Sequence, residues 1–214
     1  MPTDHLLHGH RHFQRQHLNR SREFLQRLAS EGQSPDTLFV GCSDSRVVPE
    51  LLTQSSPGAL FVVRNVANQV PPLEHSDASV GAALEYAVAH LSVANIIVCG
   101  HYHCGGIKAM LDGGGHLHKL PSLHEWLAPV SPAVDRARRE HPDADAEALW
   151  AAAVEENVVG QLWNLLSFPS VVAGLDAGTL ELHGWVYDLF SLGLRVYDAE
   201  RCQFVASREM IGSG

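Results

Sequence analysis

Two apolar segments that run directly into potential metal ligands constrain this 214-residue chain more than any other feature. Residues 38–41 (Leu-Phe-Val-Gly) lead into Cys42, and residues 95–100 (Asn-Ile-Ile-Val-Cys-Gly) lead into His101, with Cys104 three positions later. Short apolar runs of this kind are typical of buried strands. Because the carboxyl ends of parallel strands meet at one edge of a sheet, we expect these two thiols and one imidazole to converge there.

Two cysteines and one histidine form a ligand set that suits zinc. A structural zinc takes four protein ligands as a rule, whereas three ligands with an open position are the catalytic arrangement. We therefore predict one zinc per chain, bound by Cys42, His101 and Cys104, and hydration or hydrolysis by a zinc-bound hydroxide. Two plainer interpretations stay open, namely that the thiols are small buried hydrophobic groups or that they form a redox pair.

Asp44 and Arg46 follow Cys42 by two and four positions, so the same turn can place a carboxylate and a guanidinium beside the metal. The fork of an arginine side chain fits a carboxylate with two parallel hydrogen bonds. Such a pair would keep Asp44 ionised and aimed as an acceptor. The pair makes the zinc interpretation more specific than the ligands alone.

The composition limits the possible partners and compartment. The chain has 15 Lys and Arg against 24 Asp and Glu, a net charge of −9, which argues against nucleic acid or an anionic membrane as a partner. No apolar run approaches the roughly 18 residues of a membrane span, and we expect no signal peptide. Four scattered cysteines are too few for a disulfide framework, so the cytoplasm is the expected location.

Strand and helix patterns alternate along the chain. This order predicts an α/β fold, with a mostly parallel central sheet flanked by helices, a C-terminal hairpin strand and an N-terminal helical arm. We expect strands at residues 37–41, 59–63, 95–99, 180–186 and 194–198. We expect helices at residues 13–29, 49–52, 76–90, 105–110 and 144–166, with a short one ending near residue 174, and Ser76 or Asp77 as a cap. Residues 1–214 form one domain in this interpretation.

Four motifs together resemble the β-class carbonic anhydrases, over about residues 13–205. They are Cys-Ser-Asp-Ser-Arg at 42–46, Arg-Asn-Val-Ala-Asn at 64–68, Gly-His-Tyr-His-Cys-Gly-Gly at 100–106 and Leu-His-Gly-Trp-Val-Tyr-Asp at 182–188. The resemblance implies that Cys42, His101 and Cys104 bind zinc and that Asp44 and Arg46 form a catalytic dyad. The implied reaction interconverts carbon dioxide and bicarbonate.

Within that family, the resemblance favours the plant-like branch with an open site. Its substrate pocket is matched here by Gln33, Phe61, Val66, Tyr86 and Gly105. A second branch binds an inhibitory bicarbonate through a Trp, an Arg and a Tyr, at positions that correspond to Phe39, Arg64 and Tyr187. Phenylalanine at position 39 lacks the indole N–H, so structural roles are favoured for Arg64 and Tyr187. His103 is either a proton shuttle or a surface histidine.

The resemblance also implies a homodimer or a dimer of dimers, in which residues 1–30 pack as a helical arm on a partner subunit and the pocket is built at the dimer interface. The apolar stripe that this arm would bury contains Phe13, Leu18, Leu25 and Leu28. Three alternative functions differ in class: a carbonyl sulfide or carbon disulfide hydrolase, a non-catalytic bicarbonate-binding protein, and a zinc-stabilised nucleic-acid module. Intact Asp44, Arg46 and Gln33 argue against the second, and the net charge argues against the third.

Overall fold

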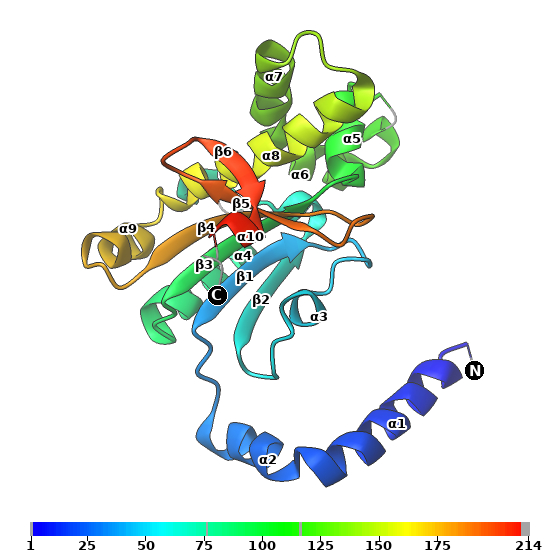
Figure 1. Cartoon of the computed structure of the whole chain (residues 1–214), viewed down its shortest axis with the longest axis vertical. Coiled ribbons are helices and arrows are strands. Elements are labelled where there is room, and N and C mark those ends of the chain that lie inside the picture. The colour runs from blue at the N-terminus through cyan, green and yellow to red at the C-terminus, as the bar shows by residue number, and fades with distance from the viewer. Residues whose placement is uncertain (1, 76, 116, 211–214) are drawn as a thin grey trace.

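The computed structural model of the chain describes residues 2–75, 77–115 and 117–210. Its centre is a six-stranded sheet in the order β2-β1-β3-β4-β5-β6, in which β1 to β4 are parallel and β5 and β6 antiparallel (Figure 1). The strands are β1 Thr37–Cys42, β2 Leu60–Asn65, β3 Asn95–His101, β4 Glu181–Tyr187, β5 Leu194–Asp198 and β6 Gln203–Ala206. The predicted α/β class with a mostly parallel sheet is confirmed.

The two strands that carry the metal ligands are the most deeply buried. Every residue of β1 is buried, and so is every residue of β3 after Asn95. Such continuous apolar burial is expected of parallel strands that are covered on both faces. Helix α8 (Ala146–Leu165) packs closely on β3 and β4 because glycines line its path: a Cβ at Gly100 would come within 2.7 Å of Val158 Cγ2.

The remaining helices mostly follow the predicted positions. They are α3 Pro49–Thr53, α4 Ala78–Glu85 with a π-helical continuation at Tyr86–His90, α5 Gly105–Leu111, α9 Pro169–Asp176 and α10 Ser207–Met210. Asp77 caps α4 by accepting hydrogen bonds from the N–H groups of Ser79 and Val80, at 2.9 and 3.2 Å. Ser76, the other candidate cap, lies outside the described residues.

The sequence did not predict β6, the short helix α10 or the two helices α6 (Pro121–Leu127) and α7 (Ser131–Glu140). Both helices have proline in the first turn, where its missing N–H costs nothing. The proline, glycine and histidine content of this region resembles that of a loop. Of the helices that the structure describes, none alone is long and apolar enough to cross a membrane. Only α8 and α9 taken together reach that length and apolar character, and an 87° bend separates them.

The N-terminal arm consists of two helices rather than the single predicted one. Helix α1 (Asp4–Arg20) includes the histidine-rich stretch, and α2 (Arg22–Glu31) follows after Ser21. Figure 1 shows both extending away from the sheet, in blue. Leu6, Leu7 and Phe13 are 62, 52 and 47% exposed, so the apolar stripe of α1 is uncovered in the single chain. The side chain of Leu18 is not among those described.

Candidate active site

Cys42, His101 and Cys104 come together where β1 and β3 end. Cys42 is the last residue of β1, His101 is the last residue of β3, and Cys104 directly precedes α5. All three are buried, and their potential ligand atoms lie within 4.8 Å of one another. The convergence that the two apolar segments predict is therefore present in the fold.

Cys42 and His101 each offer a donor that a metal cation could use. The Nδ1 of His101 lies 2.9 Å from the Tyr102 carbonyl, which leaves Nε2 with its lone pair free to bind a metal. Nε2 is buried without a hydrogen-bond partner among the described residues. The Cys104 thiol donates to Cys42 and, with His101 and the Asp44 and Ala67 N–H groups, lowers the pKa of Cys42 to about 4 against the opposing effect of burial. A thiolate beside an orphaned imidazole nitrogen suits zinc.

Asp44 and Arg46 form the predicted two-point contact at the mouth of the cluster. Arg46 Nε donates to Asp44 Oδ1 at 2.9 Å, and Nη2 donates to Oδ2 at 2.7 Å. The side-chain hydrogen bonds from Arg46 hold the pKa of the Asp44 carboxyl well below its usual range. Oδ2 also lies 3.8 Å from His101 Nε2, so the carboxylate faces the position of a metal ligand.

Arg64 has the structural role that the sequence favoured. Its Nε donates to the Cys42 carbonyl at 3.0 Å and its Nη2 to the Asp44 carbonyl at 2.7 Å, so this side chain fixes the turn that carries both residues. The Tyr187 carbonyl accepts the Tyr102 N–H at 3.0 Å. Phe39 is fully buried, with its ring edge-on to Trp185.

His103 sits between the ligands in a left-handed backbone conformation, with φ +59°. Its ring packs against Trp150 and Phe190 at centroid distances of 5.0 and 4.8 Å, and its Nε2 lies 3.2 Å from Glu147 Oε1. The side chain is 25% exposed, so His103 is a partly buried histidine rather than a free surface group.

Only part of the predicted substrate pocket lies beside the cluster within one chain. Val66 and Gly105 are close, because Val66 packs against Gly106, two residues after Cys104. Phe61 and Tyr86 contact each other at 5.7 Å between ring centroids, but at the other end of the strands. Phe61 pairs with Leu38, four residues before Cys42, which corresponds to about 13 Å at 3.3 Å per residue.

Gln33 is likewise far from the cluster, since it is exposed and lies four residues before the start of β1. The single chain thus divides the predicted pocket between two ends of the sheet. Within one subunit, Gln33, Phe61 and Tyr86 lie away from the metal ligands, and a pocket built between two subunits, as the resemblance implies, stays a prediction.

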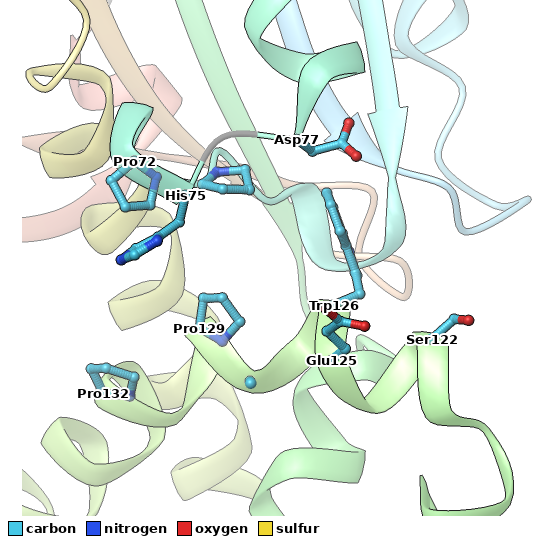
Figure 2. Close-up of a pocket in the computed structure, with 10 residues that line it drawn as sticks. Pro72, His75, Asp77, Ser122, Glu125, Trp126, Pro129 and Pro132 are labelled. Carbon is cyan, nitrogen blue, oxygen red and sulfur yellow. The ribbon is translucent and has the colours of Figure 1, made fainter.

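Two tryptophans that the sequence did not single out support the site. Trp150 on α8 donates its indole N–H to the Cys104 carbonyl at 3.1 Å, and Trp126 on α6 donates to the Val66 carbonyl at 2.8 Å. Trp126 also lines a hollow of about 700 Å³, whose walls carry Pro72 and His75 on one side and Pro129, which follows α6, on the other (Figure 2). This hollow adjoins the Val66 turn but contains none of the ligands.

Comparison with known proteins identifies the group to which this architecture belongs. The family model described as carbonic anhydrase matches residues 37–192, which include the whole cluster and the Asp44–Arg46 pair. The chain belongs to the β-carbonic anhydrase family. A carbonic anhydrase from Pseudomonas aeruginosa is 42% identical over 206 residues, covering 95% of this chain and 91% of the relative.

Solved β-carbonic anhydrases agree with the fold as well. The β-carbonic anhydrase CcaA superposes with a TM-score of 0.91 at 38% identity, covering 95% of this chain and 91% of the other. A structure of tetrameric β-carbonic anhydrases from Sordaria macrospora has a TM-score of 0.71 at 31% identity, covering 91% of this chain and 93% of that one. Family members with this fold therefore include oligomers.

Proposed function

We propose that this protein is a zinc carbonic anhydrase that interconverts carbon dioxide with bicarbonate and a proton. The observation that carries the proposal is the buried Cys42–His101–Cys104 cluster with the Asp44–Arg46 pair at its mouth. Three protein ligands leave one coordination position for the reacting oxygen. The four free cysteines are consistent with a cytoplasmic enzyme, which is part of the proposal.

The residues of the chain divide the work. When bound, zinc would act as a Lewis acid that lowers the pKa of water from 15.7 to about 7 at a site with three histidine ligands. Two thiolate ligands donate more charge to the metal, so the pKa of the water should stay higher here than at such a site. The Asp44 carboxylate would accept a hydrogen bond from the reacting oxygen and so direct the lone pair of that oxygen at carbon dioxide. Arg46 occupies Asp44 on both oxygens and keeps it from the metal, which favours the open, plant-like resting site.

The pocket is completed, in this proposal, by a second copy of the chain. Strand β2 is an edge strand whose residues 60–63 (Leu-Phe-Val-Val) are only half-buried, and such an edge readily pairs with another strand. A two-fold dimer joined by antiparallel β2 strands places the amino end of one sheet beside the carboxyl end of the other. Phe61, Tyr86 and Gln33 of one subunit then approach the cluster of its partner.

The open face beside Val66 is consistent with this arrangement. A hollow of about 470 Å³, lined by Ser43, Arg64, Val66 and Trp126 among others, adjoins the turn after β2. The N-terminal arm completes the proposed interface, because the exposed apolar residues of α1 need a surface that its own subunit does not provide. The β2 edge and the exposed arm therefore support a homodimer or a dimer of dimers.

A stopped-flow carbon dioxide hydration assay on zinc-quantified protein tests the activity directly. We expect the activity to scale with zinc content, and the zinc content of fully active protein to approach one per chain. Parallel measurements with carbonyl sulfide and carbon disulfide test the alternative hydrolase. Preference for either sulfur compound, or zinc-loaded protein without hydration activity, would contradict the proposed reaction.

Replacing Arg46 with alanine should lower hydration activity by about 10- to 100-fold while zinc stays bound. The cause is lost orientation rather than protonation: the pKa of Asp44 would rise only toward the usual value of about 3.9, so it stays ionised near neutral pH. Metal analysis and stopped-flow kinetics measure both effects. Arg46→Lys, which keeps the charge without the fork, should recover only part of the activity.

The same pair predicts a pH dependence of stability. A carboxyl group with a depressed folded-state pKa contributes stability above its unfolded pKa and loses it as the pH falls through its folded-state pKa. The stability difference between wild type and Arg46→Ala should therefore be constant near neutral pH and disappear only in strong acid. A difference that instead changed between pH 6 and 9 would show that Asp44 is not the group involved.

A further inference from the structure

Three amide side chains follow one face of helix α8 at helical spacing: Asn157, Gln161 and Asn164. Asn157 is 1% and Gln161 is 2% exposed, on a helix face that otherwise buries Ala153, Val154, Val158 and Leu165. Uncharged polar groups in such surroundings destabilise a fold unless they are hydrogen bonded. The bonding partners of these amides therefore indicate why they are present.

The partners lie in the turn after β2, residues 65–70. Asn157 Nδ2 donates to the Ala67 carbonyl at 3.1 Å, Gln161 Oε1 accepts the Val70 N–H at 2.7 Å, and Asn164 Nδ2 donates to the Val70 carbonyl at 2.9 Å. Within the turn, Gln69 Nε2 donates both to the Ala67 carbonyl at 3.0 Å and to Asn157 Oδ1 at 3.1 Å. Two side-chain amides thus hold one backbone carbonyl.

That carbonyl belongs to a strained residue. Ala67 has φ +62° and ψ +28°, a left-handed conformation that an alanine adopts only when its surroundings impose it. Asn68, the next residue, also has a positive φ of +47°. Removing the donors from the Ala67 carbonyl should let this peptide relax toward an ordinary conformation.

The strained turn lies against both ligand-bearing loops. The Asn65 carbonyl accepts the N–H of Ser43, next to Cys42, at 2.9 Å. A Cβ at Gly106, two residues after Cys104, would lie 3.3 Å from the Cβ of Ala67.

We propose that Asn157 is a positioning residue of the metal centre: together with Gln69 it clamps the Ala67 carbonyl, and this clamp holds the 65–68 turn against the loops of Cys42 and Cys104. Asn157 does not touch the metal or the substrate and acts only through Ala67. The inference rests on the proposed zinc site. Outer groups of this kind commonly change metal affinity by about 10- to 100-fold when they are lost.

The test compares Asn157→Leu, a change of similar side-chain size, with Asn164→Leu as a matched control. Asn164 lies on the same helix face and loses the same group, but it contacts Val70 rather than Ala67. We expect zinc transfer from Asn157→Leu to a chromogenic chelator to be about tenfold faster or more than from wild type, and the control to stay within about twofold. In cobalt-substituted protein, the thiolate-to-cobalt absorption band should shift in Asn157→Leu alone.

If Asn157→Leu does not fold, Gln69→Met replaces it in the test. It removes the other donor to the Ala67 carbonyl and also removes Gln69 Oε1, which is buried without a partner in the described part of the chain. Wild-type zinc release and an unshifted band in the folded variant would overturn the inference, and so would equal effects in Asn164→Leu. Wild-type protein that binds no zinc would refute the proposed metal site itself.

Discussion

Cys104→Ser is expected to lose most of its zinc and to lower carbon dioxide hydration by more than about 100-fold, since direct ligands should matter more than the groups around them. Cys104 has no neighbouring thiol or imidazole that could replace it, because the cluster of described residues contains only Cys42 and His101 besides. Metal analysis after dialysis and stopped-flow assays measure the two losses.

Cys202→Ser is the matched control for this change. Cys202 is an exposed free cysteine, outside the described metal cluster, and its replacement should leave both zinc content and activity at wild-type levels. Full zinc occupancy in Cys104→Ser would show that the ligand assignment is wrong.

Mixing two inactive variants should restore activity if the pocket is shared between subunits. Cys104→Ser lacks the metal site but keeps Phe61 and Tyr86, whereas Phe61→Ala keeps the metal site and lacks part of the pocket. In a mixed dimer, one of the two sites combines an intact cluster with an intact Phe61. Random pairing makes half of the dimers mixed, so co-refolded protein should regain about a quarter of wild-type activity.

The single variants assayed separately and then mixed without refolding provide the baseline. The same experiment with Arg46→Ala in place of Phe61→Ala is a matched control. Arg46 lies beside the cluster of its own chain, so no site in this mixed dimer has both Cys104 and Arg46, and subunit exchange should restore no activity. Activity of Cys104→Ser plus Phe61→Ala that stays at the sum of the two single variants would show that Phe61 does not serve a partner's site.

The metal site was predictable because its parts adjoin regular structure. Cys42 and His101 end two strands whose apolar character is evident in the sequence, and parallel strands bring their carboxyl ends together. Asp44 and Arg46 are close in sequence to Cys42, so a single turn fixes their contact. The family motifs then named the ligands and the pocket residues.

The parts that escaped prediction depend on distant contacts. No local pattern specifies the register of β1 and β2, which pairs Phe61 with Leu38 and Asn65 with Cys42, although the resemblance did imply a pocket shared between two subunits. The hydrogen bond from Trp126 to the Val66 carbonyl depends on helix α6, which was not predicted because a sequence that starts with proline resembles a loop. The amides of α8 left a visible signal, namely polar residues at positions 157, 161 and 164 within an otherwise apolar stripe, but a search for apolar periodicity passes over them.

The distance between the Phe61–Tyr86 pair and the cluster has a consequence for how the enzyme behaves on dilution. If each reaction centre is assembled from two chains, turnover per chain depends on the fraction of chains that have a partner, which falls as the total concentration approaches the dissociation constant of the dimer. Specific activity would then report assembly directly. Synthesis rate and the local concentration of the chain would regulate such an enzyme without any effector molecule.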